Sequence, residues 1–268
     1  MYEHIDRVQR KCEAAELLRD AQVSPKGMTA LYMLLVLALN LVSSLSTGGF
    51  LQIFISIFTE LLATVLGAGF VLYCMAVRRR ERAEYLTLFD GFSFVGKIIL
   101  LNLITSFFIL LWSMLFFIPG IIAAYRYHFA MFNLYENPGI GVMEALDMSK
   151  RQTYGYKLQL FTLDLSYLGW ALLAALPSLV LVSLVNRDVT MALLYGTPVP
   201  ETYFGLPILA LDLLFGLWQM VVCLFYLPHN TCVRLAYFET AKRTSGIGEG
   251  TEPQQSHWDG WNAPDGLS

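Results

Sequence analysis

Charged residues are scarce in this sequence, and the shortage already restricts the class of protein. Only 15% of the 268 residues are charged, whereas 56% are hydrophobic. A typical soluble domain is about 25% charged. The apolar residues also gather into long runs instead of spreading evenly along the chain. This excludes an ordinary cytoplasmic enzyme, a disordered chain and a nucleic-acid-binding protein, and it predicts a polytopic membrane protein.

Catalytic and metal-binding signatures are missing as well. The sequence contains no GxSxG, HExxH, GxxxxGK[ST] or GxGxxG string, so the usual hydrolase, zinc-protease and nucleotide-binding patterns do not apply. The four cysteines follow no CxxC or zinc-type spacing and are expected to be reduced thiols in packed positions. We therefore predict a protein that is not an enzyme and has no cofactor and no metal site.

What the sequence does contain is a set of runs long enough to cross a bilayer, for which about 20 apolar residues are needed. Alternation with period 2 is absent, which argues against a β-barrel. The fold class predicted is all-α, a polytopic transmembrane helical bundle of about six spans. The six predicted spans are 28–45, 50–77, 98–118, 119–135, 158–185 and 204–227.

The basic residues give these spans an orientation, because Lys and Arg concentrate on the cytoplasmic side. With six crossings and both termini inside, 16 of the 18 Lys and Arg residues are cytoplasmic, and only Arg187 is outside. Arg126 then lies within the membrane. If 119–135 were instead a re-entrant segment, 11 would be inside and 6 outside. Six spans in a bacterial plasma membrane, with cytoplasmic termini, is the prediction.

Three segments flank or interrupt this 28–243 membrane domain. Residues 1–27 predict an amphipathic helix, either lying on the inner membrane surface or packed on the protein's own inner loops. Residues 141–154 predict a cytoplasmic surface helix. The tail, 244–268, is rich in Gly, Pro, Ser and Gln and is expected to be disordered. Its aromatic cluster at 257–261 is a candidate for docking on the membrane or on a partner.

A basic run follows the second span. Its arginines serve as an orientation signal, as a site for anionic lipid headgroups, or as both. They are Arg78, Arg79, Arg80 and Arg82.

A series of short motifs resembles a family of bacterial integral membrane proteins catalogued as domain of unknown function 975. The motifs are Ile118-Pro119-Gly120-Ile121-Ile122, Glu136-Asn137-Pro138, Glu144-Ala145-Leu146 with Ser149-Lys150, Gly155-Tyr156-Lys157, and Asp164-Leu165-Ser166-Tyr167-Leu168-Gly169-Trp170. The similarity extends over about 86–242. The resemblance implies a multi-span α-helical protein with no assigned activity or cofactor.

Ionisable residues inside the spans are the candidate functional residues, because each costs about 2.5–3.5 kcal/mol at the middle of a membrane helix. Helix rise places Glu60, Arg126 and Asp212 at similar depth in the outer half, which predicts a cluster centred on Arg126. A second polar layer is predicted nearer the inner face. It comprises His128, Asp164, His229 and Asn230.

Both layers have two interpretations. Such groups usually face a bundle interior or a water-filled cavity, and then form a substrate or proton pathway. Alternatively they are paired polar groups that only fix helix register.

Three functions are compatible with the sequence. The first is a non-enzymatic transport-related component or accessory subunit of a membrane complex. The second is a scaffold or regulatory protein that recruits lipids or partners through its cytoplasmic helices and tail. The third is a membrane-embedded enzyme. The expected partners are the lipid bilayer and other membrane subunits or a second copy of the chain, with no nucleic acid.

Overall fold

A computed structural model describes residues 3–45, 49–196, 198, 200 and 202–248. The aromatic cluster predicted at 257–261 lies outside these residues. The elements are α1 (Arg7–Arg19), α2 (Pro25–Leu45), α3 (Gly49–Arg78), the 3₁₀ helix η1 (Tyr85–Phe94), α4 (Val95–Leu115), α5 (Phe117–Arg126), α6 (Ala130–Glu136), α7 (Val142–Gln152), α8 (Lys157–Tyr195), the short strands β1 (Thr202–Tyr203) and β2 (Leu206–Pro207), and α9 (Ile208–Ser245). The all-α class predicted from the sequence is confirmed.

Local sequence explains where several of these helices begin and end. The Asp6 carboxylate caps α1 by accepting a hydrogen bond from the Val8 amide at 2.9 Å. Pro25 opens α2, at a helix position that needs no amide donor. Gly196 and Gly246 end α8 and α9 in the left-handed conformation, with φ of +66° and +65°.

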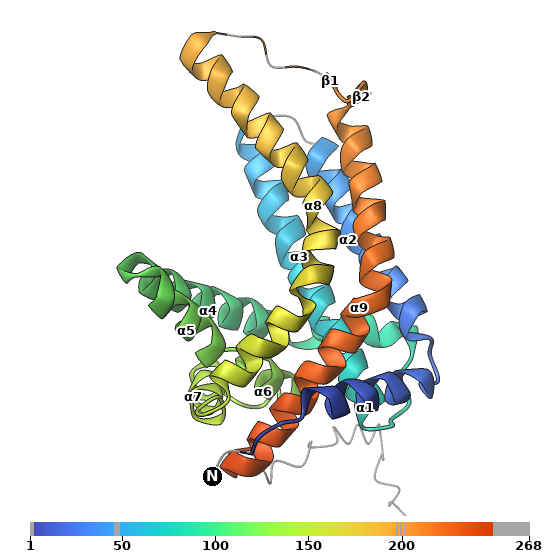
Figure 1. Ribbon diagram of the computed structural model, residues 1–268, viewed down its shortest axis with the longest axis vertical. Coiled ribbons are helices and arrows are strands. Elements are labelled where there is room, and N and C mark those ends of the chain that lie inside the picture. Colours follow the sequence, from blue (N-terminus) through green and yellow to red (C-terminus); the bar gives the residue numbers. More distant parts are fainter. Residues whose placement is uncertain (1–2, 46–48, 197, 199, 201, 249–268) are drawn as a thin grey trace, which may run out of the picture.

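Four helices stand side by side in the upper part of Figure 1: α2, α3, α8 and α9. Helices α8 and α9 contain Pro177 and Pro228, and both change direction along their length. A proline inside a helix removes one backbone hydrogen bond and permits such a bend.

The described part of the chain contains five helical segments long and apolar enough to cross a membrane. They are Pro25–Leu45, Gly49–Arg78, Tyr85–Leu115, Lys157–Tyr195 and Ile208–Ser245. The last two run past the predicted limits of 185 and 227.

The sixth predicted span, 119–135, is not one helix. The ten-residue α5 and the seven-residue α6 are separated by the turn that contains His128. Ten residues rise only about 15 Å, too little to cross the hydrocarbon alone. Helix α5 instead returns along α4, and the hairpin they form points away from the other long helices (Figure 1). The predicted count of six spans is therefore approximate.

The start of α4 and the end of α5 both lie at one end of the molecule, which we call the packed end. It consists of α1, η1, α6, α7 and the adjoining ends of the long helices. The opposite end, with the β1–β2 hairpin, is the open end. Its small cluster of Leu181, Tyr203 and Leu211 contrasts with the large aromatic core of the packed end.

The two described chain ends meet at the packed end. The Arg243 guanidinium lies 2.8 Å from the Glu3 carboxylate. Arg79 and Lys242 both pair with Glu136, at 2.7 and 2.8 Å. Because α1 and the end of α9 lie at the same end of the molecule, the chain runs between the two ends an even number of times. The basic residues that follow α3 and those at the end of α9 also lie together at this end.

Candidate functional site

A polar network at the packed end centres on Asp164 of α8. One carboxylate oxygen accepts a hydrogen bond from an Arg234 amino nitrogen of α9 at 2.8 Å, and the other accepts one from the Tyr125 hydroxyl of α5 at 2.9 Å. The network thus joins three helices. Asp164 was a predicted member of the inner layer. Arg234 and Tyr125 are not part of the predicted layer, because the predicted last span ends at 227 and the predicted span 119–135 is continuous.

His128 lies next to this network, in the turn between α5 and α6. Its ring packs against Tyr125, Phe129 and Phe132, with centroids 5.7–6.1 Å away. Burial, reinforced by the Arg234 charge and opposed by Asp164, lowers the pKa of His128 to about 4. Within the described part of the chain, its buried Nε2 atom has no hydrogen-bond partner. This enclosed imidazole therefore packs among the aromatic rings of the core.

The other two members of the predicted inner layer lie on α9. His229 Nδ1 is 2.7 Å from the Tyr167 hydroxyl, and His229 Nε2 is 2.9 Å from the Lys11 carbonyl oxygen. This histidine therefore ties α8, α9 and α1 together. Asn230 is buried, and its Oδ1 has no partner among the described residues. The predicted layer is thus two adjoining sets of contacts, one around Asp164 and one around His229.

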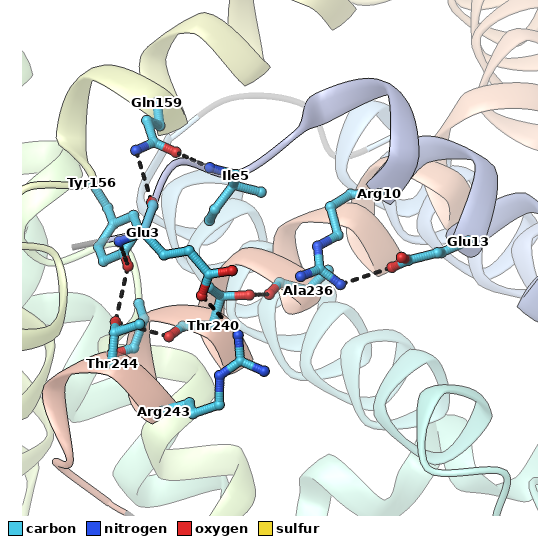
Figure 2. A network of polar contacts seen from close by, with 11 residues as sticks. Glu3, Ile5, Arg10, Glu13, Tyr156, Gln159, Ala236, Thr240, Arg243 and Thr244 are labelled. Atoms are coloured by element: carbon cyan, nitrogen blue, oxygen red, sulfur yellow. Dashed lines mark hydrogen bonds and ion pairs between the residues drawn. The ribbon is translucent and has the colours of Figure 1, made fainter. Parts of the chain in front are cut away.

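The N-terminal segment packs on α8 and α9 (Figure 2). The Glu3 amide donates to the Tyr156 hydroxyl at 2.9 Å, and the Ile5 amide donates to Gln159 at 3.1 Å. Lys11 stands 4.4 Å from the centre of the Tyr167 ring. Of the two predicted placements, packing on the protein itself agrees with these contacts. The packing surface, however, is formed by two long helices and not by loops.

The four predicted headgroup arginines divide into two pairs. Arg78 binds the Glu239 carboxylate and donates to the Cys232 carbonyl oxygen, while Arg79 pairs with Glu136. Arg80 and Arg82 are exposed and form no ion pair within the described residues. The first pair therefore holds α3 to α6 and α9, and only the second pair is free to meet a membrane surface.

The predicted cluster of Glu60, Arg126 and Asp212 is not joined by ion pairs in the described part of the chain. Arg126 ends α5 at the packed end, where its carbonyl oxygen accepts hydrogen bonds from Ser149 and Thr153 of the α7 region. Glu60 and Asp212 are exposed on α3 and α9. The depth estimate for Arg126 assumed a full crossing at 119–135, and the short α5 removes that assumption.

Asp212 lies instead in a polar recess between α2, α8 and α9. The recess has a volume of 210 Å³, and no hydrogen bond to Asp212 is formed by any other described residue. Amide and hydroxyl groups accompany the carboxylate, although the surrounding helix surfaces are apolar. The residues that line the recess are Leu37, Asn40, Leu41, Ser44, Ser178, Asp212, Gly216 and Gln219.

The described side chains were also compared with the arrangement that a metal ion requires. Among the described residues, no group of three or more His, Cys, Asp and Glu side chains is arranged to hold a metal ion. All four cysteines are free thiols.

The fold and these sites define a class, an α-helical polytopic membrane protein with a polar packed end. Comparison with known families is more specific. Residues 114–244 match the family described as "Protein of unknown function (DUF975)". This match confirms the resemblance predicted from the sequence motifs. No curated protein and no solved structure matches the chain.

Proposed function

We propose that this chain is a non-enzymatic, transport-related membrane protein that binds a small cationic solute in the recess at Asp212. The proposal includes a bacterial plasma membrane and a cytoplasmic packed end. The gathering of the basic segments at that end supports the orientation, because Lys and Arg favour the cytoplasmic side.

The unpaired carboxylate in the recess carries the proposal. An ionised side chain among membrane helices is costly, and such residues usually mark solute or ion pathways. Asn40, Ser44 and Gln219 add polar groups that could replace part of a solute's hydration shell. A carboxylate in surroundings of low dielectric constant attracts a cation much more strongly than it does in water.

The bend in α8 supplies a structural route for movement next to this site. Pro177 precedes Ser178 of the recess and interrupts the hydrogen bonds of the helix. Interrupted helices next to midplane sites occur in transporters. A change in the bend at Pro177 would widen or close the recess, since α8 provides one of its walls.

Uptake by proteoliposomes tests the transport proposal. We expect full-length protein to accumulate methylammonium, a small cation, under an inside-negative potential. Asp212→Asn should lower the rate at least tenfold, because each 1.4 kcal/mol of lost interaction is a factor of ten. Glu60→Gln removes a span carboxylate outside the recess and should leave the rate unchanged. No uptake above empty liposomes, or equal uptake by Asp212→Asn, would contradict the proposal.

A second observation favours an accessory-subunit role. Glu60 is exposed on α3, close to the exposed apolar residues Ile57 and Phe58. A carboxylate facing lipid is unfavourable, whereas one facing a basic or amide group of a neighbouring subunit is stabilised. In-membrane cross-linking through a cysteine introduced at Phe58 would detect a partner or a second copy. Glu60→Gln should reduce the cross-linked yield, and a yield that does not change would exclude this role for Glu60.

The scaffold alternative makes a different prediction. It requires deletion of the tail, 244–268, to reduce partner recruitment more than Asp212→Asn or Glu60→Gln does. Helix α1 packs on α9, and its Arg7 and Lys11 side chains donate hydrogen bonds to α8, which weighs against a free N-terminal recruiting helix.

A further inference from the structure

A second cavity lies where α1, the start of α2 and the bend of α9 meet. Its volume is 350 Å³, within the range of small-molecule pockets. Its lining combines the basic side chains Arg19 and Lys26 with several apolar ones. The lining residues are Ala15, Leu18, Arg19, Ser24, Pro25, Lys26, Leu224, Phe225, Pro228 and His229.

The cavity is positively charged. Arg19 and Lys26 are both exposed, and neither forms an ion pair with any described residue. The lining contains no Asp or Glu, since the neighbouring Asp20 faces a different cavity. His229, the remaining ionisable group of the lining, is held by Tyr167 and by the Lys11 carbonyl. Two free cations therefore face a space without a counter-ion.

The cavity also lies at the boundary of the membrane. Lys26 is the second residue of α2, a candidate span, and the apolar run of that helix begins two residues later at Met28. Phe225 lies on the membrane side of Pro228 in α9 and is 60% exposed. The Lys26 ammonium stands 5.4 Å from the centre of the Phe225 ring, so the charged and apolar parts of the cavity adjoin.

We propose that this cavity binds an anionic phospholipid. The phosphate of the headgroup lies between Arg19 and Lys26, and an acyl chain descends over Leu224 and Phe225. A free phosphate ion would satisfy the two cations but leave the apolar wall uncovered. The combination of a cationic rim and an adjoining exposed aromatic surface at the bilayer boundary is what an anionic lipid complements.

This site differs from the exposed Arg80 and Arg82, which follow the end of α3 at Arg78. It is also separate from the recess at Asp212, which is lined by other residues. The lipid proposal therefore does not depend on transport. Occupation of the cavity would bridge α1 to α2 and α9, and we expect it to stabilise the packing of the N-terminal helix.

Native mass spectrometry of the full-length protein in detergent, with dioleoylphosphatidylglycerol as the probe, tests the site. Dioleoylphosphatidylcholine, with the same chains but no net charge, should bind at least tenfold more weakly. Each basic residue near an anionic lipid contributes about 1 kcal/mol, which is roughly fivefold in affinity. We therefore expect Arg19→Gln with Lys26→Gln to weaken phosphatidylglycerol binding roughly 25-fold.

The matched control is the double variant Lys150→Gln with Arg151→Gln, on the surface of α7. It removes the same charge from two exposed residues outside the cavity and should keep wild-type affinity. Equal weakening in the two double variants, or equal binding of the two lipids, would overturn the proposal. Circular dichroism should show unchanged helix content in both variants, because all four side chains are exposed.

Two further arms separate a lipid from free phosphate. Phe225→Ala should weaken binding of dioleoylphosphatidylglycerol while leaving that of glycerol 3-phosphate nearly unchanged, because glycerol 3-phosphate carries the phosphate but has no acyl chain to contact the ring. Inorganic phosphate at 10-fold excess over the lipid should not displace it. Full displacement, together with no effect of Phe225→Ala, would overturn the lipid assignment in favour of a simple phosphate site.

Discussion

At the packed end, side chains from helices far apart in the sequence enclose one another, whereas at the open end the same long helices expose most of their surface. Tyr73, Phe129 and Phe238 are almost fully buried in the first region. In the second, Phe50 and Phe54 of α3 face outward. The packed end thus buries its aromatic side chains against one another, as the core of a soluble protein does. At the open end, the exposed apolar side chains are left to contact the membrane.

The difference shows where the protein's own interactions determine its structure. Ion pairs and aromatic contacts tie the N-terminus, α6 and the end of α9 together. In the open half, fewer specific contacts connect the helices, such as the Trp218 indole donating to the Leu173 carbonyl at 3.0 Å. Substitutions should therefore affect stability strongly at the packed end and weakly at the open end.

The largest expected contrast is between two phenylalanines. Phe238 packs between Phe129 and Phe132, with ring centroids 5.5 and 5.6 Å away. Phe238→Ala should lower the free energy of unfolding by about 3–5 kcal/mol, because it leaves a cavity in a closed core. Phe54→Ala, on the exposed face of α3, should change it by less than about 0.5 kcal/mol. Denaturant titration in mixed micelles, followed by circular dichroism, measures both. Similar losses for the two variants would mean that the open end is covered by specific packing.

Much of this comparison could be predicted from the sequence. The apolar runs predicted the long helices, and the Lys and Arg residues indicated which segments share one end. These signals are local or additive, so they survive without knowledge of the contacts. The end of α9 was different. Apolar content falls after residue 227, yet the helix continues to Ser245 because the packed end buries Leu235, Tyr237 and Phe238.

The candidate sites were less predictable for the same reason. Which acid meets Arg234 depends on how α8 and α9 lie against each other, and hydropathy does not encode that register. Asp212 was recognised by its charge in an apolar run, but the amides that share its recess lie on α2 and α9. Arg126 is predicted inside the membrane because 119–135 is predicted to be a single crossing. The turn at His128 instead divides this segment into α5 and α6.

Two glycines, one in each region, are expected to differ next most in how much an alanine substitution lowers the free energy of unfolding. A Cβ atom added to Gly69 of α3 would lie 1.8 Å from the Leu88 carbonyl oxygen of η1, and backbone cannot move aside easily. Gly69→Ala should destabilise the protein by roughly 3 kcal/mol. At Gly216 of α9 the nearest atom is the end of the flexible Leu37 side chain.

Gly216→Ala is therefore the matched variant for the open half. Since Leu37 can change rotamer and alanine favours a helix over glycine by about 1 kcal/mol, we expect a net change within about 1 kcal/mol. The same denaturant titration compares the two glycines. A loss at Gly216 as large as that at Gly69 would show that α2 and α9 are held in fixed register at the open end.

The smallest of these expected effects is a dependence on pH, because among the described residues a histidine buried beside an arginine occurs only at the packed end. Burial lowers the pKa of His128 to about 4, below the value of about 6.5 in an unfolded chain. Between pH 6.5 and pH 4 the imidazole is protonated in the unfolded state but not in the folded state. The free energy of unfolding therefore decreases as the pH falls through this range. Linkage gives a loss of about 2 kcal/mol between pH 7 and pH 5. His128→Phe should remove that part of the acid dependence, while His4→Phe, at an exposed position, should retain it. If the unfolding curves of wild type and His128→Phe shift equally with pH, the imidazole is already accessible to protons, and the packed end is less closed than its aromatic core implies.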